Sequence, residues 1–256
     1  MSVMKEWTDE QILNYYLGIE HSDYPRVFWE AMRPHLDGCT SLIDIGCGPG
    51  AFALAAARDG FHVQAVDISK KNLDALQGRI KELGLKKVKL IYGDWLEVEA
   101  EKSDVAVCAY SFGGTIGTAR GLKKIFEIAG KAAFLISPYS SVQTDFLTEE
   151  LYVKMGIAPP SFSGDYRDLL HLLQNQGKEV ECKIIEYDFG MPLASRDELD
   201  NCVFYMGEKL GLPPTDLLKE HLQKIITTRN GLCWVPNPRK SAMIIWKGRS
   251  ETVDND

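Results

Sequence analysis

The chain has 256 residues, of which 45% are hydrophobic and 25% are charged. This balance is typical of a soluble globular protein and argues against general disorder. The 29 basic and 36 acidic residues give a net charge of -7, which counts against DNA or RNA as the main partner because nucleic-acid binding favours a basic surface.

The sequence also argues against a membrane or secreted protein. No apolar run approaches the ~20 residues of a membrane span, and the first residues turn polar at once, unlike a secretory signal. The six cysteines are scattered, without a Cys-x-x-Cys pair or a zinc spacing. We therefore expect free thiols, a cytoplasmic location, no metal and no membrane partner, and the oligomeric state stays open.

Two helices are expected at the start of the chain. A capping box at Thr8–Gln11 precedes an apolar helical pattern, and a second helix is expected over Pro25–Arg33. We expect residues 1–37 to form an N-terminal helical cap.

From Ser41 onward, short apolar runs alternate with helical patterns. Five runs are expected to form strands, and the intervening segments carry amphipathic helices; the runs are 41–45, 62–67, 88–92, 104–110 and 132–136. Strands that alternate with helices indicate a parallel, doubly wound α/β sheet with helices on both faces.

The C-terminal half is less regular. A helix is expected over 166–176, a strand over 180–187 and a last strand over 241–246. Helices are also expected after the capping box at 195–198 and over 215–227. We interpret 38–248 as one domain with helical insertions near 138–165 and 191–239, followed by a frayed tail at 249–256.

The clearest motif is the glycine loop Asp44-Ile-Gly46-Cys47-Gly48-Pro-Gly50, which follows a strand and precedes a helix. Glycine allows backbone angles closed to other residues and lets a ligand approach the main chain. The loop also fits a dinucleotide fingerprint, with Asp67 at the distance of a ribose contact, so a nicotinamide-dependent oxidoreductase stays open. Asp44 would repel a pyrophosphate but suits a cationic amino group.

The chain resembles the class I S-adenosylmethionine-dependent methyltransferases. The resemblance covers roughly residues 41–138 and rests on the glycine loop, on Asp67 at the end of the second strand and on Gly-Asp-Trp at 93–95. It implies a Rossmann-like seven-stranded sheet of order 3-2-1-4-5-7-6 with strand 7 antiparallel. It also implies S-adenosylmethionine as the cofactor, with S-adenosylhomocysteine as the product.

The resemblance implies a role for each matched position. The glycines would line the methionine portion, Asp67 would bind the ribose, Ile68 and Asp94-Trp95 would surround the adenine, and Tyr110 would border the methyl group. The implied cofactor-binding set is Asp44, Gly46, Cys47, Gly48, Gly50, Asp67, Ile68, Asp94, Trp95 and Tyr110.

Methyl transfer needs alignment and exclusion of water more than a fixed catalytic triad. Tyr16, His21 and Tyr110 are weak candidates for a catalytic role, and Tyr15 with Tyr16 are candidates for a lid. Aromatic residues in the expected cap indicate an enclosed pocket for a small-molecule acceptor.

Two other functions stay open. One is a non-catalytic S-adenosylmethionine-binding module, because the sequence does not identify the acceptor residues. The other is a metalloid methyltransferase that uses Cys182, Cys202 or Cys233, although these cysteines are not closely spaced.

Overall fold

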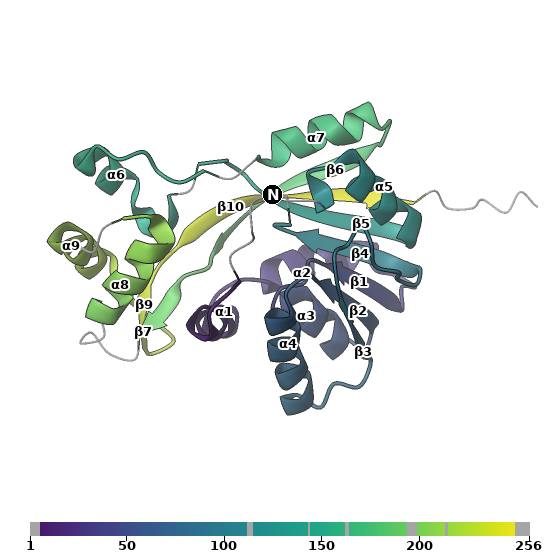
Figure 1. The fold of residues 1–256 in the computed structure, drawn as a ribbon, viewed down its shortest axis with the longest axis horizontal. Helices are drawn as coiled ribbons and strands as arrows, with labels where there is room; N and C mark the ends of the chain where they lie inside the picture. The colour runs from purple at the N-terminus through teal and green to yellow at the C-terminus, as the bar shows by residue number, and fades with distance from the viewer. Residues whose placement is uncertain are drawn as a thin grey trace, which may run out of the picture.

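The computed structural model describes residues 6–111, 115–142, 144–161, 164–193, 199–212 and 215–248. The expected tail at 249–256 and the capping box at 195–198 lie outside the described residues. Figure 1 shows a central sheet with helices on both sides and a smaller lobe, into which strands β6 and β10 extend.

The central sheet has seven strands in the order β3-β2-β1-β4-β5-β10-β6. The first five are mutually parallel, whereas β10 is antiparallel to both of its neighbours. This confirms the expected order, with the last strand inserted between the fifth and the sixth. The strands are β1 (Ser41–Ile45), β2 (His62–Asp67), β3 (Val88–Tyr92), β4 (Ser103–Ala109), β5 (Ala129–Pro138), β6 (Val180–Asp188) and β10 (Pro238–Lys247).

Helices cover both faces of this sheet (Figure 1). One hydrophobic core lies under α2 (Arg26–Met32), α3 (Ala51–Arg58) and α4 (Lys70–Glu82). The other lies under α5 (Ala119–Ile128) and α7 (Tyr166–Asn175). Strand residues alternate between the two cores because successive side chains point to opposite faces.

The two N-terminal helices pack in different parts of the molecule. Helix α1 (Asp9–His21) begins with the expected capping box, in which Thr8 and Gln11 bond each other's backbone N–H groups. Helix α2 belongs to the sheet's core, where Phe28 and Met32 are fully buried. A short 3-10 helix, η1 (Arg33–His35), leads to β1.

The smaller lobe consists of helices and a second sheet. Its helical elements are η3 (Asp145–Leu147), α6 (Glu149–Met155), α8 (Leu199–Leu210) and α9 (Asp216–Ile225). Its sheet has the order β7-β9-β8, formed by Met191–Leu193, Leu232–Val235 and Thr227–Arg229.

The insertion expected to be helical near 191–239 contains this three-stranded sheet as well as helices α8 and α9. The expected helix over 215–227 ends at Ile225, and Thr227 already begins β8. Strands of three or four residues are too short to show a period-two pattern. The turn at Asn230-Gly231, with both residues at positive φ, is a typical hairpin signal and is the feature that sequence reasoning missed.

No helix among the described residues is long and apolar enough to cross a membrane.

Candidate functional site

The glycine loop turns from the carboxyl end of β1 into α3. Gly46, Gly48 and Gly50 all have positive φ, at 67°, 53° and 93°. A Cβ at Gly46 would lie 2.5 Å from Ser111 Oγ, and one at Gly50 would overlap Leu76. Among the described residues, a Cβ at Gly48 would meet no atom within 4 Å. Packing therefore requires Gly46 and Gly50, whereas Gly48 borders open space where a ligand can approach the main chain.

Asp44 lies beneath this loop and is buried, with 2% of the residue exposed. Burial and, to a smaller extent, the nearby Asp67 together raise the pKa of its carboxyl group to about 7, although the Ala53 N–H donates to it at 2.8 Å. A positive group bound at the loop would offset the desolvation and the repulsion together. The site is thus electrostatically suited to a cation.

Asp67 ends β2 and ties the loop in place. One carboxylate oxygen accepts from Gly48 N and the other from Ser69 N, both at 2.7 Å. Ser69 caps α4 by accepting from Asn72 N, so Asp67 is not needed as the helix cap. Since an ionised carboxylate has about four acceptor positions, Asp67 keeps capacity for further donors such as ribose hydroxyls.

The residues expected around an adenine differ in their exposure to solvent. Ile68 is 47% exposed, and Asp94 is exposed at the end of β3, where it accepts from Leu96 N at 2.8 Å. Trp95 is only 4% exposed and its indole N–H donates to the Gly121 carbonyl at 3.3 Å. The Lys124 ammonium lies 4.6 Å from the centre of the Trp95 ring. Trp95 therefore packs in the core under α5, while Ile68 and Asp94 border solvent.

Tyr110 directly follows β4 and adopts a φ of 56°, which is unusual for a bulky residue. Its hydroxyl lies 2.6 Å from that of Tyr187 on β6 and 2.8 Å from Ser241 Oγ on β10. Tyr24 packs beside both tyrosine rings, with centroid separations of 6.3 and 5.9 Å. Burial raises the pKa of Tyr110, so its hydroxyl stays protonated near neutral pH. We call Tyr24, Tyr110, Tyr187 and Ser241 the tyrosine cluster.

Sequence reasoning identified Tyr110 but missed the other members of the tyrosine cluster as site residues. Tyr187 and Ser241 lie 77 and 131 positions from Tyr110 along the chain. The available signal was their position near the ends of two strands that the predicted topology makes neighbours.

Helix α1 is anchored beside the glycine loop. The Tyr16 hydroxyl donates to the Pro49 carbonyl at 2.9 Å, and the Arg79 guanidinium lies 5.2 Å from the centre of the Tyr16 ring. Asp9 pairs with Lys71 of α4 at 2.9 Å. Burial raises the pKa of Tyr16, so its hydroxyl suits a hydrogen-bond donor better than a base.

The two other lid and base candidates occupy different surroundings. Tyr15 makes edge contacts with Tyr24 and Phe189, with centroids 6.4 and 5.7 Å apart. His21 is the last residue of α1 and is half-buried. Tyr15 thus adjoins the tyrosine cluster, whereas His21 lies where the chain leaves α1.

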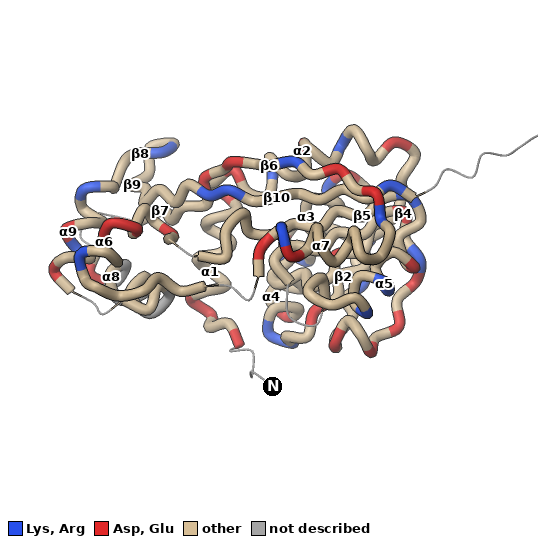
Figure 2. The backbone as a smooth tube through the Cα atoms, turned by 90° about the horizontal axis from the view of Figure 1, so that it is seen from above, with Lys and Arg blue, Asp and Glu red and all other residues tan. Residues whose placement is uncertain are grey.

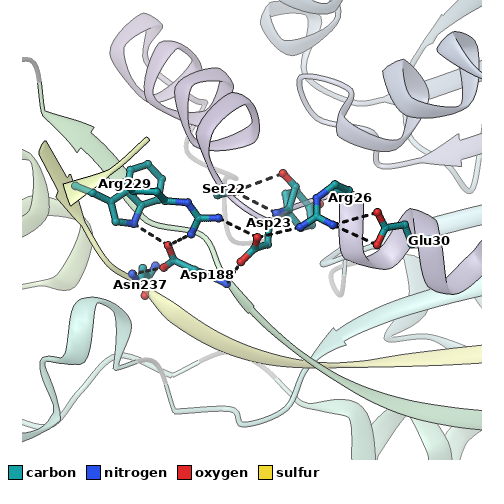
Figure 3. A network of polar contacts seen from close by, with 9 residues as sticks. Ser22, Asp23, Arg26, Glu30, Asp188, Arg229 and Asn237 are labelled. Atoms are coloured by element: carbon teal, nitrogen blue, oxygen red, sulfur yellow. Dashed lines mark hydrogen bonds and ion pairs between the residues drawn. The ribbon is translucent and has the colours of Figure 1, made fainter. Parts of the chain in front are cut away.

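Asp188, at the end of β6, joins the central sheet to the smaller lobe (Figure 3). Its carboxylate accepts from Arg229 Nη1 at 2.9 Å, Trp234 Nε1 at 2.7 Å and Asn237 N at 2.6 Å. Arg229 also donates to Asp23 at 2.9 Å, just after α1. Although partial burial opposes it, hydrogen bonds from Asp188 N and Arg229 hold the pKa of Asp23 below its usual value. This network fixes the turn after α1 and the three-stranded sheet to one strand end.

The cysteines do not converge among the described residues. Cys182 is exposed on β6 of the main sheet, and Cys233 is half-buried on β9 of the smaller sheet. The side chain of Cys202 lies outside the described part of the chain. Cys47, in the glycine loop, is buried, and burial raises its thiol pKa. Within the described ranges, no group of three His, Cys, Asp or Glu side chains is arranged to hold a metal ion.

Comparison with known proteins agrees with this geometry. Residues 42–129 match the family described as methyltransferase domain. The chain is 28% identical over 193 residues to an uncharacterised protein of Haemophilus influenzae, covering 73% of this chain and 69% of that protein.

Two solved structures share the fold. Phosphoethanolamine N-methyltransferase 2 of Haemonchus contortus has a TM-score of 0.58 at 14% identity, covering 96% of this chain and 59% of that one. Magnesium protoporphyrin IX methyltransferase of Synechocystis has a TM-score of 0.51 at 14% identity, covering 94% and 89%. At these identities the likeness concerns the fold.

The strand order, the antiparallel β10 and the glycine loop at the end of β1 define the Rossmann-like methyltransferase fold. The match of residues 42–129 to a methyltransferase-domain family agrees with this fold and supports the resemblance to the class I S-adenosylmethionine-dependent methyltransferases.

Proposed function

We propose that the protein transfers a methyl group from S-adenosylmethionine to a small-molecule acceptor. The observation that carries this proposal is the open space over Gly48, whose N–H donates to Asp67, together with the buried Asp44 at the end of β1, which accepts from Ala53 N. A glycine main chain beside two carboxylates accommodates a ligand that brings an amino group and a diol.

The residues present fit that cofactor. Gly46, Gly48 and Gly50 would line the methionine portion, with Asp44 near its amino group; Asp67 would accept from the ribose hydroxyls. Ile68 and Asp94, which are both exposed, would lie beside the adenine. When bound, S-adenosylmethionine would supply a methyl group on a positively charged sulfur. The nucleophile of the acceptor would bond to the methyl carbon in line with the sulfur, which would leave as S-adenosylhomocysteine.

The protein's own groups would chiefly orient the reactants and exclude water. Tyr110 lies at the end of β4, next to the strand that carries the glycine loop, and its ring is held by hydrogen bonds to Tyr187 and Ser241. Tyr16 holds α1 against the backbone of the loop. These contacts would fix two walls of the site, and none requires a charged catalytic base.

The same electrostatics count against a nicotinamide dinucleotide. Its pyrophosphate would approach the loop near Asp44 and Asp67, and two carboxylates at that position disfavour a doubly negative ligand. A methyl donor with a cationic amino group and a cationic sulfur does not meet this repulsion.

A small molecule is the acceptor that the site supports best. Basic and acidic residues are interspersed along the chain in Figure 2, which favours a small acceptor over nucleic acid. The Haemonchus contortus methyltransferase that shares this fold was solved in complex with phosphomonomethylethanolamine and S-adenosylhomocysteine. We expect the reaction to be cytoplasmic, because Cys47 and Cys108 are free thiols and a reducing compartment preserves these.

Calorimetric titration with S-adenosylhomocysteine, run beside NADH, tests the cofactor. We expect binding of S-adenosylhomocysteine alone, weakened at least about tenfold in Asp67→Asn, a loss of about 1.4 kcal/mol. Asp74→Asn is the matched control, because Asp74 is an exposed residue of α4 that pairs with Lys70 of the same helix. Binding of NADH alone would refute the proposal. Turnover with an acceptor panel, followed by release of S-adenosylhomocysteine, separates an enzyme from a non-catalytic binding module.

A further inference from the structure

Arg239 is the second residue of β10 and lies beside the tyrosine cluster. It lies opposite Tyr187 in the pairing of β10 with β6, and Ser241 follows two positions later on the same face of the strand. The Tyr110 hydroxyl lies within hydrogen-bond distance of both Tyr187 and Ser241. Because Tyr110 also follows the strand next to the glycine loop, the cluster connects the expected methyl site to Arg239.

The Arg239 side chain is held on one side and open on the other. Its Nε donates to Asp145 Oδ1 at 3.1 Å, and its Nη2 donates to both carboxylate oxygens at 2.6 and 2.5 Å. No hydrogen bond among the described residues uses Nη1. The Arg239 side chain is 23% exposed, compared with 7% for Asp145. The pair therefore leaves a positioned N–H donor group with access to solvent.

The segment that carries Asp145 is strained and strongly held. Phe146 and Leu147 have φ values of 59° and 58°, each costing about 1–2 kcal/mol for a residue with a side chain. Phe146 N donates to Asn237 Oδ1 at 2.8 Å, and Phe146 O lies 2.8 Å from His221 Nε2. Strained backbone persists where its surroundings over-determine it and is concentrated at ligand sites.

We propose that the acceptor carries a carboxylate or phosphate group and that Arg239 binds this group through Nη1. A planar guanidinium is suited to such oxyanions, and Asp145 holds it in one orientation. The neighbouring hydroxyls of Tyr187 and Ser241 can rotate to donate to the same anion. This inference rests on the proposed function, since it gives the acceptor its chemical class.

The test uses the full chain saturated with S-adenosylhomocysteine. Calorimetric binding of phenyl phosphate and of benzoate is compared with that of the neutral benzyl alcohol, at ionic strength matched with chloride. We expect one of the two anions to bind at millimolar concentration and the neutral analogue to bind at least about tenfold more weakly. The phosphate and carboxylate arms show which oxyanion the site prefers.

Variants assign the anion binding to Arg239. The double variant Arg239→Gln/Asp145→Asn removes the charge without leaving a buried carboxylate unpaired, and we expect it to lose the preference for the anion. If the double variant does not fold, Arg239→Lys takes its place, and we expect this variant to keep only part of the preference for the anion. Arg120→Gln is the control, because Arg120 is exposed on α5 and pairs with Glu97.

Two outcomes would overturn the inference. One is that neither anion binds better than benzyl alcohol up to ~50 mM, a concentration that saturates a millimolar site. The other is that the anion binds equally well to wild type and to the double variant. Binding of S-adenosylhomocysteine is measured first, so its absence in the wild type would refute the proposed function itself.

Discussion

Alanine substitutions in the glycine loop should separate its role in stability from its role in cofactor binding. Gly48 and Gly50 both have positive φ, but a Cβ at Gly48 meets open space whereas one at Gly50 overlaps Leu76. Gly84, just after α4, is a control, because its φ is 65° and a Cβ there also meets no atom of the described chain within 4 Å.

The structure sets the expected magnitudes. Alanine in a left-handed conformation costs about 1–2 kcal/mol, which is the full expected loss for Gly48→Ala and for Gly84→Ala. Gly50→Ala adds an overpacking cost of about 1–3 kcal/mol against Leu76. We therefore expect a loss of about 2–5 kcal/mol in the free energy of unfolding for Gly50→Ala.

The affinities of these variants for S-adenosylhomocysteine should follow a different order from their stabilities. Gly48→Ala places a methyl group in the space where the ligand approaches, and we expect at least about a tenfold loss of affinity for S-adenosylhomocysteine. Gly84→Ala should bind like the wild type. Urea unfolding measures the stabilities and calorimetry measures the affinities. If Gly48→Ala and Gly84→Ala bound equally well, the open space over Gly48 would not be the cofactor site.

Three further predictions concern Asp44, Asp188 and Tyr16. Burial raises the Asp44 pKa from 3.8 to about 7, so between about pH 4 and pH 7 the folded state keeps a proton that the unfolded state loses. The free energy of unfolding of the wild type should therefore fall over this range relative to that of Asp44→Asn. The change is at most about 4 kcal/mol; parallel urea-unfolding profiles of the two proteins would contradict it. Asp188→Ala should cost about 2–4 kcal/mol because it leaves the Trp234 and Arg229 donors without this acceptor; an unchanged calorimetric Tm would refute this. Tyr16→Phe should cost about 1 kcal/mol by removing the hydrogen bond to Pro49, and faster hydrogen exchange in α1 would report it.

Several features were predictable because they depend on neighbours in the sequence. The alternation of apolar runs and amphipathic helices determined the five parallel strands and their helices, since periodicity reports which face of an element is buried. The capping box at Thr8–Gln11 is likewise local, because it satisfies backbone groups within a few residues, and so are the positive φ angles of the loop glycines. The resemblance over 41–138 then gave the order of the whole sheet.

The side chains that we propose for acceptor binding come together only in the tertiary structure. Tyr110, Tyr187 and Ser241 share hydrogen bonds only because β10 inserts between β5 and β6, and Arg239 meets Asp145 across 94 positions of sequence. The small sheet β7-β9-β8 also needs distant strands, and β8 and β9 are too short for a periodic pattern to reveal them. Local sequence therefore determined the elements and the cofactor loop. Long-range pairing decided which side chains meet in the tyrosine cluster and at Arg239, because each such contact depends on the packing of several elements at once.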